Sequence, residues 1–182
     1  MMRFAKIGLA AAIALATVAG PVFAASAADT LVITTKDGEI DIALRPDIAP
    51  NHVKQIEALA KKGFYDGIVF HRVIDGFMAQ TGDPTGTGAG GSDLPDLKAE
   101  FSKENFSRGT VGMARSQDPN SANSQFFIML DDGDFLNGQY TVVGKVSKGM
   151  DVVDKIKKGD PSDNGSVTDP DKMLKVTVAG AQ

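Results

Sequence analysis

The 182-residue sequence contains no cysteine, no tryptophan and only two histidines, His52 and His71. The absence of cysteine excludes both a disulfide framework and a thiolate metal site. The scarcity of histidine leaves a Ser–His–acid hydrolase only two candidate bases. We interpret His52, at the start of an expected helix, as a surface or capping residue. We interpret His71 as a packed structural residue, with a general-base role as the alternative.

The sequence is also short of positive charge. It has 19 lysine and arginine residues against 23 aspartate and glutamate residues, a formal net charge of −4. A nucleic-acid-binding protein is expected to carry a basic surface, so this composition argues against a nucleic-acid partner. Hydrophobic residues make up 42% of the chain, which is enough for one well-packed domain of this length.

An apolar run near the N-terminus, residues 7–19, is shorter than the roughly 20 residues that a membrane span needs. The basic residues Arg3 and Lys6 precede it, and small-residue sites ending at Ala24 and Ala27 follow it. This order is typical of a secretory signal peptide with its cleavage site. A retained membrane anchor is the alternative interpretation.

We therefore predict a signal peptide over residues 1–27, cleaved near Ala24 or Ala27, and one domain over residues 28–182. Removal of the signal peptide would leave a net charge of −6, because it takes two basic residues with it. An exported chain without cysteine is compatible with the bacterial periplasm, where a core of this size needs no disulfides. An extracellular destination is the alternative.

Short β-branched or alternating runs dominate the rest of the sequence, and only two stretches have the apolar spacing of a helix. The expected strands cover residues 30–36, 39–44, 70–72, 77–80, 111–115, 125–130, 140–146 and 173–179, and the expected helices residues 46–62 and 150–158. Many short strands with two helices favour an all-β sandwich or barrel over a parallel α/β sheet. We find no internal repeat and no linker that would divide the domain.

The stretch Phe70–Gln80, FHRVIDGFMAQ, combines a guanidinium, two bulky apolar side chains and an amide. Side chains alternate along a strand, so Phe70 and Arg72 share one face and His71 points to the other. A turn and a second extended run, ending in Gln80, follow. This pattern predicts a cationic hydrogen-bond donor beside an apolar pocket, suited to bind an apolar ring next to a carbonyl.

A second segment repeats this combination of side chains. Gln125 and Phe127 fall on one face of an expected strand, which places an amide beside an aromatic ring. Simple core packing is the alternative interpretation for Phe127, and also for the apolar residues between Phe135 and Tyr140.

Two other motifs are compared with known ligand sites. Residues 86–91 formally match the glycine pattern of dinucleotide-binding loops, but no βαβ unit surrounds them, so we expect a plain loop. Residues 160–171 place oxygen side chains and a glycine as in a calcium loop. The twelfth position is Asp rather than Glu and no helix follows, which favours a solvated acidic turn, with calcium binding as the alternative.

Taken together, the motifs closely resemble, in order and spacing, the cyclophilin family of peptidyl-prolyl cis–trans isomerases over about residues 30–180. The matching segments are Phe70-His71-Arg72, Gly76-Phe77-Met78-Ala79-Gln80, Gly82-Asp83, Gly86-Thr87-Gly88, Met113-Ala114, Ser124-Gln125-Phe126-Phe127-Ile128, Phe135-Leu136-Asn137-Gly138 and Val143-Gly144-Lys145-Val146. The resemblance implies a mainly β fold, a closed eight-stranded antiparallel β-barrel capped by two α-helices, with the active cleft on its outer face. It also implies an isomerase that acts on proline-containing polypeptides and requires no metal or cofactor.

The resemblance assigns a role to each matching side chain. The catalytic residues are Arg72, Gln80 and Gln125, with Arg72 as the hydrogen-bond donor to the prolyl nitrogen. The substrate-binding residues are Phe77, Met78, Ala114, Arg115, Phe127, Leu136 and Tyr140. As an exported isomerase, the protein would act as a monomer on unfolded exported chains. A proline-peptide binding module or chaperone without turnover is the alternative.

Three positions depart from the best-known eukaryotic members, which have tryptophan, histidine and asparagine in place of Phe135, Tyr140 and Arg115. Phenylalanine and tyrosine at the first two positions resemble bacterial cyclophilins. We expect activity to survive, and the binding of cyclosporin-type ligands to weaken because the indole donor is missing. We also expect the extra cation at Arg115 to favour acidic residues near the substrate proline.

Overall fold

The computed structural model describes residues 29–180, and the signal peptide predicted over residues 1–27 lies outside this range. Within it the strands are β1 (Thr30–Thr35), β2 (Gly38–Leu44), β3 (Arg72–Ile74), β4 (Met78–Thr81), β5 (Thr110–Met113), β6 (Phe126–Met129), β7 (Val142–Lys148) and β8 (Lys175–Ala179). The helices are α1 (Pro50–Lys61), α2 (Met150–Val153) and the 3-10 turns η1 (Asp134–Leu136) and η2 (Pro161–Asp163). The mainly β class is confirmed, and each expected strand and α-helix has a counterpart, with several ends shifted.

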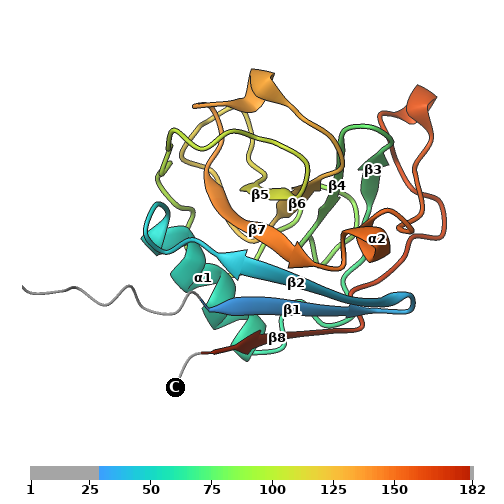
Figure 1. Ribbon diagram of the computed structural model, residues 1–182, viewed down its shortest axis with the longest axis horizontal. Helices are drawn as coiled ribbons and strands as arrows, with labels where there is room; N and C mark the ends of the chain where they lie inside the picture. The colour runs from blue at the N-terminus through green and yellow to red at the C-terminus, as the bar shows by residue number, and fades with distance from the viewer. Residues whose placement is uncertain (1–28, 181–182) are drawn as a thin grey trace, which may run out of the picture.

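All eight strands belong to one antiparallel sheet, in the order β3-β4-β6-β5-β7-β2-β1-β8. Figure 1 shows the sheet curling around a common centre, with β1, β2 and β8 along the bottom of the view and β3 and β4 at the right. The expectation of a closed barrel is wrong. Strands β3 and β8 are the two ends of the order and do not pair with each other, so the sheet is a curled, open half-barrel.

The segment between α2 and β8 explains why the sheet stays open. Val73 of β3 exchanges backbone hydrogen bonds with Gly159 and Gly165, so this segment covers the outer edge of β3. The segments that precede β3 and β8 meet each other, because residues 67–70 and 171–173 share backbone hydrogen bonds. An irregular connection thus protects the edge that strand pairing would otherwise have to cover.

The two α-helices form where the apolar spacing predicts them, but α2 is shorter than expected. Pro50 opens α1 and Gly63, with φ +72°, follows its end. Val152, Val153 and Ile156 are buried as expected, yet the helix stops at Val153 and continues as turns. The N–H groups of Lys155 and Ile156 donate to carbonyls three residues earlier, as in turns, and the N–H of Gly159 then donates to the carbonyl of Val73 in β3.

The sheet separates two hydrophobic cores. Along β6, Phe126 and Ile128 belong to the larger core inside the half-barrel, while Phe127 and Met129 belong to a smaller one. Successive side chains of a strand point to opposite faces, so the smaller core lies on the outer face of the sheet. This alternation is what places a set of apolar side chains outside the barrel without exposing them.

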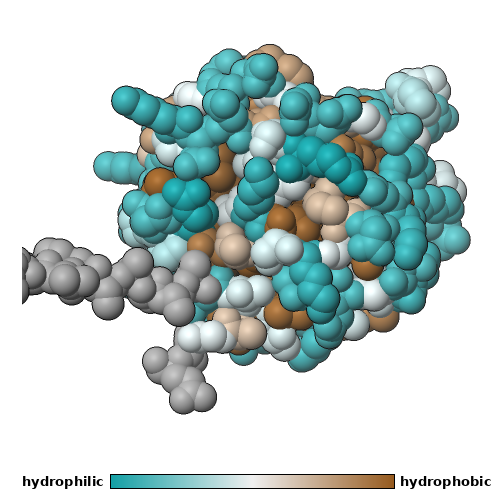
Figure 2. Space-filling view, viewed as in Figure 1, coloured by the Kyte–Doolittle hydropathy of each residue, from teal (hydrophilic) through white to brown (hydrophobic). Residues whose placement is uncertain are grey.

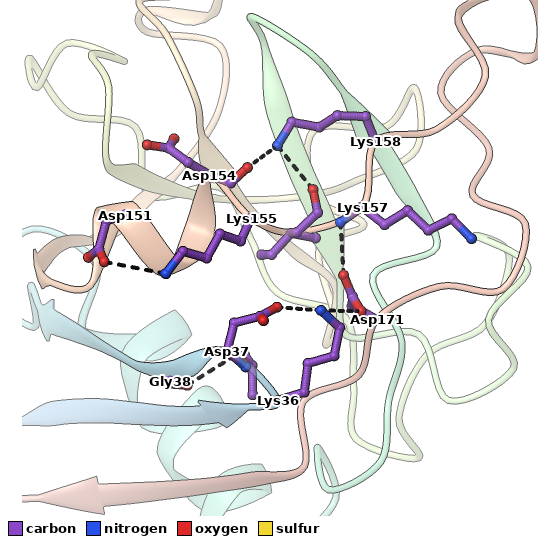
Figure 3. A network of polar contacts seen from close by, with 11 residues as sticks. Lys36, Asp37, Gly38, Asp151, Asp154, Lys155, Lys157, Lys158 and Asp171 are labelled. Carbon is purple, nitrogen blue, oxygen red and sulfur yellow. Dashed lines mark hydrogen bonds and ion pairs between the residues drawn. The ribbon is translucent and has the colours of Figure 1, made fainter.

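A network of charged side chains fastens the segment after α2 to the β1–β2 hairpin (Figure 3). The carboxylate of Asp171 accepts a hydrogen bond of 2.8 Å from the N–H of Lys157 and lies 3.4 Å from the ammonium of Lys36. Lys36 also pairs with Asp37 in the hairpin turn, and Lys158 donates to carbonyls at the end of α2. These contacts hold the irregular segment in place without regular secondary structure.

Hydrophilic side chains predominate on the face seen in Figure 2, where apolar ones surface only in small, separate patches. Among residues 29–180, the large apolar side chains that stand exposed are Phe101, Phe135 and Leu174. No helix in the same range is long and apolar enough to cross a membrane.

Candidate active site

A pocket of about 230 Å³ opens on the outer face of the sheet, above the smaller core. Strands β3, β4 and β6, the turn η1 and the loops after β5 and before β7 all contribute to it. Its lining consists of Arg72, Phe77, Met78, Gln80, Ala114, Arg115, Phe127, Phe135, Leu136 and Tyr140. We refer to it below as the ring pocket. It is apolar on one side and carries guanidinium and amide groups on the other.

The apolar wall is rigid because it is also part of a core. Met78, Phe127 and Leu136 are at most 6% exposed and belong to the smaller core. Phe106, fully buried, stacks on Phe127 with ring centroids 5.7 Å apart, and Tyr140 meets Phe127 edge-on at 5.9 Å. Aromatic pairs at such distances attract each other beyond simple burial. The wall is therefore formed before any ligand arrives.

Arg72 presents its guanidinium to the ring pocket and is held in place from two sides. Its Nε and Nη2 atoms donate to the backbone and side-chain oxygens of Asn164 at 2.9 and 3.0 Å, and Nη1 donates to Oε1 of Gln80 at 3.2 Å. No carboxylate within residues 29–180 lies within 4.0 Å of it. Burial lowers the pKa of Arg72 from its usual value, but a guanidinium still remains charged. One N–H of Nη2 has no hydrogen-bond partner in the described part of the chain.

Two glutamines continue the hydrogen bonds away from Arg72. Nε2 of Gln80 donates to Oε1 of Gln125 at 2.9 Å, and Nε2 of Gln125 donates to the carbonyls of Gly88 and Gly90 at 3.0 and 2.8 Å. A carbonyl can only accept, so the amide nitrogen of Gln125 must face the glycines. With Gln125 in this orientation, its oxygen accepts from Nε2 of Gln80, and the oxygen of Gln80 therefore faces the guanidinium of Arg72. All the hydrogen bonds from Arg72 to the glycine loop are then satisfied together.

The glycine-rich loop that anchors Gln125 is itself organised by one buried carboxylate. Asp83, 1% exposed, accepts hydrogen bonds from the N–H groups of Thr85, Thr87, Gly88 and Gly90 at 2.6–3.1 Å. Burial alone would raise the pKa of Asp83, but the hydrogen bonds from Thr85, Gly90 and Gly88 outweigh it and lower the pKa to about 2. Residues 86–91 therefore form a loop, as expected, and Asp83 fixes its backbone where it lines a pocket.

A second pocket, of about 540 Å³, lies between this glycine loop and the loop after β5. It shares Gln80, Ala114 and Arg115 with the ring pocket, so the two form one continuous cleft. Its other walls combine the glycine loop with polar side chains, among them Asp96 and Gln125. A peptide whose proline occupied the ring pocket could extend along this cleft.

The structure brings together the side chains that the sequence singles out. Nine of them line the ring pocket: Arg72, Phe77, Met78, Gln80, Ala114, Arg115, Phe127, Leu136 and Tyr140. The tenth, Gln125, lines the second pocket and reaches the ring pocket through Gln80. Their individual roles in catalysis and binding stay predictions.

Sequence reasoning missed two residues of this site. Asn164 holds Arg72 from 92 positions further along the chain, and Phe106 backs the aromatic wall. The Asn164-Gly165 pair does predict a turn, because asparagine tolerates the left-handed backbone found there, φ +50°. Nothing in the local sequence indicates that this turn meets β3.

The two histidines lie outside the ring pocket. His52 is fully buried, with Nδ1 2.6 Å from a carboxylate oxygen of Glu100, so the expectation of a surface or capping residue is wrong on its exposure. His71 is 8% exposed, and neither of its ring nitrogens is hydrogen-bonded in the described structure. It precedes β3 and lines a cavity together with Arg72 and Gln80, so the prediction that it faces away from Arg72 is wrong. The prediction that Phe70 shares the face of Arg72 is also wrong, because Phe70 belongs to the larger core inside the half-barrel. Burial lowers the pKa of His71, which keeps its ring neutral.

The acidic segment 160–171 does not gather its oxygens as a calcium loop would. Asp160 caps η2 by accepting the N–H of Ser162, and Asp171 pairs with Lys36. Within residues 29–180, no group of three or more histidine, aspartate or glutamate side chains is placed to hold a metal ion.

Comparison with known proteins identifies relatives of this chain. A model of the family described as "Cyclophilin type peptidyl-prolyl cis-trans isomerase/CLD" matches residues 30–178. A protein of Brucella suis named "Probable peptidyl-prolyl cis-trans isomerase" is 59% identical, over 97% of this chain and 97% of its own. The peptidyl-prolyl cis-trans isomerase A of Dickeya dadantii is 42% identical, over 78% of each chain.

Solved structures give the same result. A cyclophilin-type isomerase of Cryptosporidium parvum, determined in the presence of the dipeptide Ala-Pro, superposes with a TM-score of 0.76. It is 29% identical, and the match covers 84% of this chain and 99% of that one. The cyclophilin AquaCyp293 of Hirschia baltica superposes with a TM-score of 0.72, at 29% identity, over 81% of this chain and 73% of its own.

Proposed function

This chain belongs to the family of cyclophilin-type peptidyl-prolyl cis–trans isomerases, and on that premise we propose that it accelerates X–Pro rotation in exported proteins through Arg72. The observation that carries the proposal is the guanidinium of Arg72 in the wall of the ring pocket, fixed by Asn164 and Gln80 and paired with no carboxylate in the described structure.

Rotation about a peptide bond breaks the amide resonance, which sets a barrier of about 18–20 kcal/mol. In the twisted state the prolyl nitrogen regains its lone pair and accepts hydrogen bonds better than in the planar states. A donor that faces this nitrogen therefore stabilises the transition state more than the ground state, which is the requirement for catalysis. The unpartnered N–H of Arg72 supplies such a donor, and no covalent bond has to break.

The apolar wall would hold the proline ring while the preceding carbonyl turns. Burial of a ring of this size against Phe77, Met78, Phe127 and Leu136 contributes on the order of 1.5–3 kcal/mol. Gln80 and Gln125 would orient the guanidinium and bind the peptide backbone. Because their side chains are already held by hydrogen bonds, little conformational entropy would be lost when the peptide binds.

The client class and the location rest on the N-terminal sequence. Residues 1–27 have the pattern of a secretory signal peptide, which supports export to a bacterial periplasm. Uncatalysed X–Pro isomerisation takes tens to hundreds of seconds, slow enough to limit folding. We therefore place the protein among the folding catalysts for exported, proline-containing polypeptides.

The test is the exchange rate between the cis and trans forms of a short X–Pro peptide, measured by NMR. Arg72→Ala should lower kcat/KM about 100-fold, the usual effect of removing one transition-state donor, while peptide binding persists. Arg45→Ala is the matched control, because Arg45 pairs with Asp47 and Glu104 outside the ring pocket. If Arg72→Ala exchanged the peptide as fast as the wild type, the protein would be a binding module and not an Arg72-dependent enzyme.

A further inference from the structure

The described part of the chain contains four arginines, and they fall into two pairs by their surroundings. Arg45 and Arg108 each form an ion pair with a carboxylate within 4.0 Å. Arg72 and Arg115 have no such partner within residues 29–180, and both line the ring pocket. No aspartate or glutamate lines that pocket. In a chain with a net charge of −4, the ring pocket is thus locally cationic.

Arg115 is held in a fixed position without being neutralised. Its guanidinium lies over the ring of Tyr140, with Cζ 4.3 Å from the ring centroid. Nε and Nη2 donate to the carbonyl of Gln139 at 3.3 and 2.9 Å, and Nη1 donates to the carbonyl of Ser116 at 2.9 Å. Carbonyl oxygens carry no net charge, so the positive charge remains available. One N–H of Nη2 is also without a partner in the described structure.

The place of Arg115 in the cleft separates its task from that of Arg72. Arg72 lines the ring pocket but not the second pocket, whereas Arg115 lines both. If proline occupies the ring pocket, Arg115 stands beside the neighbouring residues of the peptide. The carboxylate in the second pocket, Asp96, already accepts a hydrogen bond from Asn123 at 2.9 Å. Arg115 is therefore the cation that a substrate side chain would meet at the junction of the pockets.

We propose that Arg115 is a specificity-determining residue that favours substrates with an aspartate or glutamate close to the proline, where the peptide passes from the ring pocket into the second pocket. This inference rests on the proposed function, because it requires proline to occupy the ring pocket. The recognising chemistry is a guanidinium with one free N–H and a side-chain carboxylate.

The expected preference is modest because the site is only half-buried. A partly exposed ion pair between Arg115 and a substrate carboxylate should raise kcat/KM for that substrate by about two- to five-fold. The preference should weaken with salt, since charges near the surface are screened. Raising NaCl from about 50 mM to about 500 mM should therefore bring the ratio close to one.

The experiment compares kcat/KM for acetylated and amidated Ala-Pro peptides in which glutamate, glutamine or lysine is moved through the two positions on each side of the Ala-Pro pair. At one or more positions, glutamate should exceed glutamine by about two- to five-fold and lysine should fall below it. In Arg115→Gln the ratio of kcat/KM for the glutamate peptide to that for the glutamine peptide should fall to about one, and in Arg115→Glu it should fall below one. Lys61→Gln, an exposed site on α1 that changes the net charge equally, should leave the ratio as in the wild type.

The possible outcomes separate this inference from the proposed function. Equal rates for all three peptides at every position, with isomerisation intact, would overturn the role of Arg115 and leave Arg72 catalysis standing. A preference for glutamate that persists in Arg115→Gln would overturn it as well. The salt dependence in the wild type gives a second measurement that needs no variant. If no peptide were isomerised at all, the proposed function would fail, and this inference with it.

Discussion

Asn164 shows how a single residue far away in the sequence can decide the geometry of a site. Asn164 does not line the ring pocket, but its backbone and side-chain oxygens accept hydrogen bonds from two of the three guanidinium nitrogens of Arg72. The third nitrogen is held by Gln80. Hydrogen bonds to all three nitrogens thus fix the orientation of the planar guanidinium, and with it the direction of its unpartnered N–H.

Asn164→Gly should lower kcat about three- to ten-fold, because it removes one hydrogen bond to a charged group that is partly exposed. Glycine keeps the left-handed backbone and the carbonyl that binds Nε, so only the bond from Nη2 is lost. The KM for the peptide should change less than kcat, since binding depends on the apolar wall. Asp163→Ala, in the same loop and without a hydrogen bond to Arg72, serves as the control. Equal kcat values for both variants would mean that Asn164 does not position the arginine.

Phe135 offers a prediction about ligands rather than catalysis. It stands at the rim of the ring pocket, 63% exposed, and contacts Phe77 with ring centroids 5.4 Å apart. Phe135→Trp should tighten inhibition by cyclosporin about tenfold, because the indole N–H adds a hydrogen-bond donor that the rim lacks. Phe101→Trp, at another exposed phenylalanine that does not line the ring pocket, should change nothing. A nanomolar inhibition constant for the wild type would contradict the explanation.

At this scale the sequence predicted the site well where the partners are near in the chain. Arg72, Met78 and Gln80 lie on two strands of one hairpin, so the alternation of side chains already brings them together. The contacts of Asn164 and the buried pairing of His52 with Glu100 could not be predicted. They join segments about 92 and 48 positions apart, whose meeting depends on the complete fold.

Among the elements, the glycine-rich loop depends most on one interaction. Asp83 replaces the backbone pairing that a strand would provide, by accepting four N–H groups of the loop. The loop in turn holds Gln125 through Gly88 and Gly90. The carboxylate thus acts on the active site through a chain of hydrogen bonds without touching it.

The stability of the protein should therefore fall in acid as Asp83 takes up a proton. Its pKa of about 2 in the folded state lies below its usual value near 3.8, so this stabilisation is complete above about pH 4 and lost as the pH falls through 2. The depression corresponds to about 2 kcal/mol. Asp83→Asn should lower the free energy of unfolding by about this amount at neutral pH and by less at pH 2.

Urea unfolding at several pH values between 7 and about 2 would measure this difference. Asp93→Asn is the control, because Asp93 is exposed and makes no hydrogen bond in the described structure. A constant difference between the wild type and Asp83→Asn at every pH would show that the carboxylate is not the titrating group.

For the elements as a set, the sequence predicted the strands better than the ends of the helices. Alternation and β-branching are local signals, and β1, β2 and β8 carry them clearly, whereas β6 is a short, wholly buried apolar run. The expected helix over residues 150–158 has only four residues in the structure, and the chain beyond it continues as turns until Gly159 bonds to β3. A propensity cannot reveal a competing partner on a distant strand.

For the whole molecule, the closure of the barrel was the expectation that failed. Residues 29–180 form eight antiparallel strands and two α-helices, but the free edge of β3 is covered by an irregular segment rather than by β8. The resemblance to the family carried the strand count correctly. Whether the last ladder forms depends on the path of residues 159–172, which have no strand-like pattern of their own.

The signal peptide predicted over residues 1–27 concerns the full chain and can be tested by expression. When the full chain is expressed in a bacterium with a periplasm, we expect the mature protein to begin directly after Ala24 or Ala27. N-terminal sequencing and mass spectrometry of the periplasmic fraction would determine this. A version without residues 1–27 should stay in the cytoplasm with the same isomerase activity. Recovery of the uncleaved chain in the membrane fraction would instead support a retained anchor.

The sharing of Met78, Phe127 and Leu136 between the smaller core and the ring pocket has a consequence for protein engineering. A change of shape that admits a different ring also opens a void in the outer layer, and truncation of such a phenylalanine typically costs about 3–5 kcal/mol. Selection for new substrates in this scaffold would thus meet a thermal limit early. Altered preferences should arise first at the rim, at Phe135 and Arg115, where the melting temperature is least at stake.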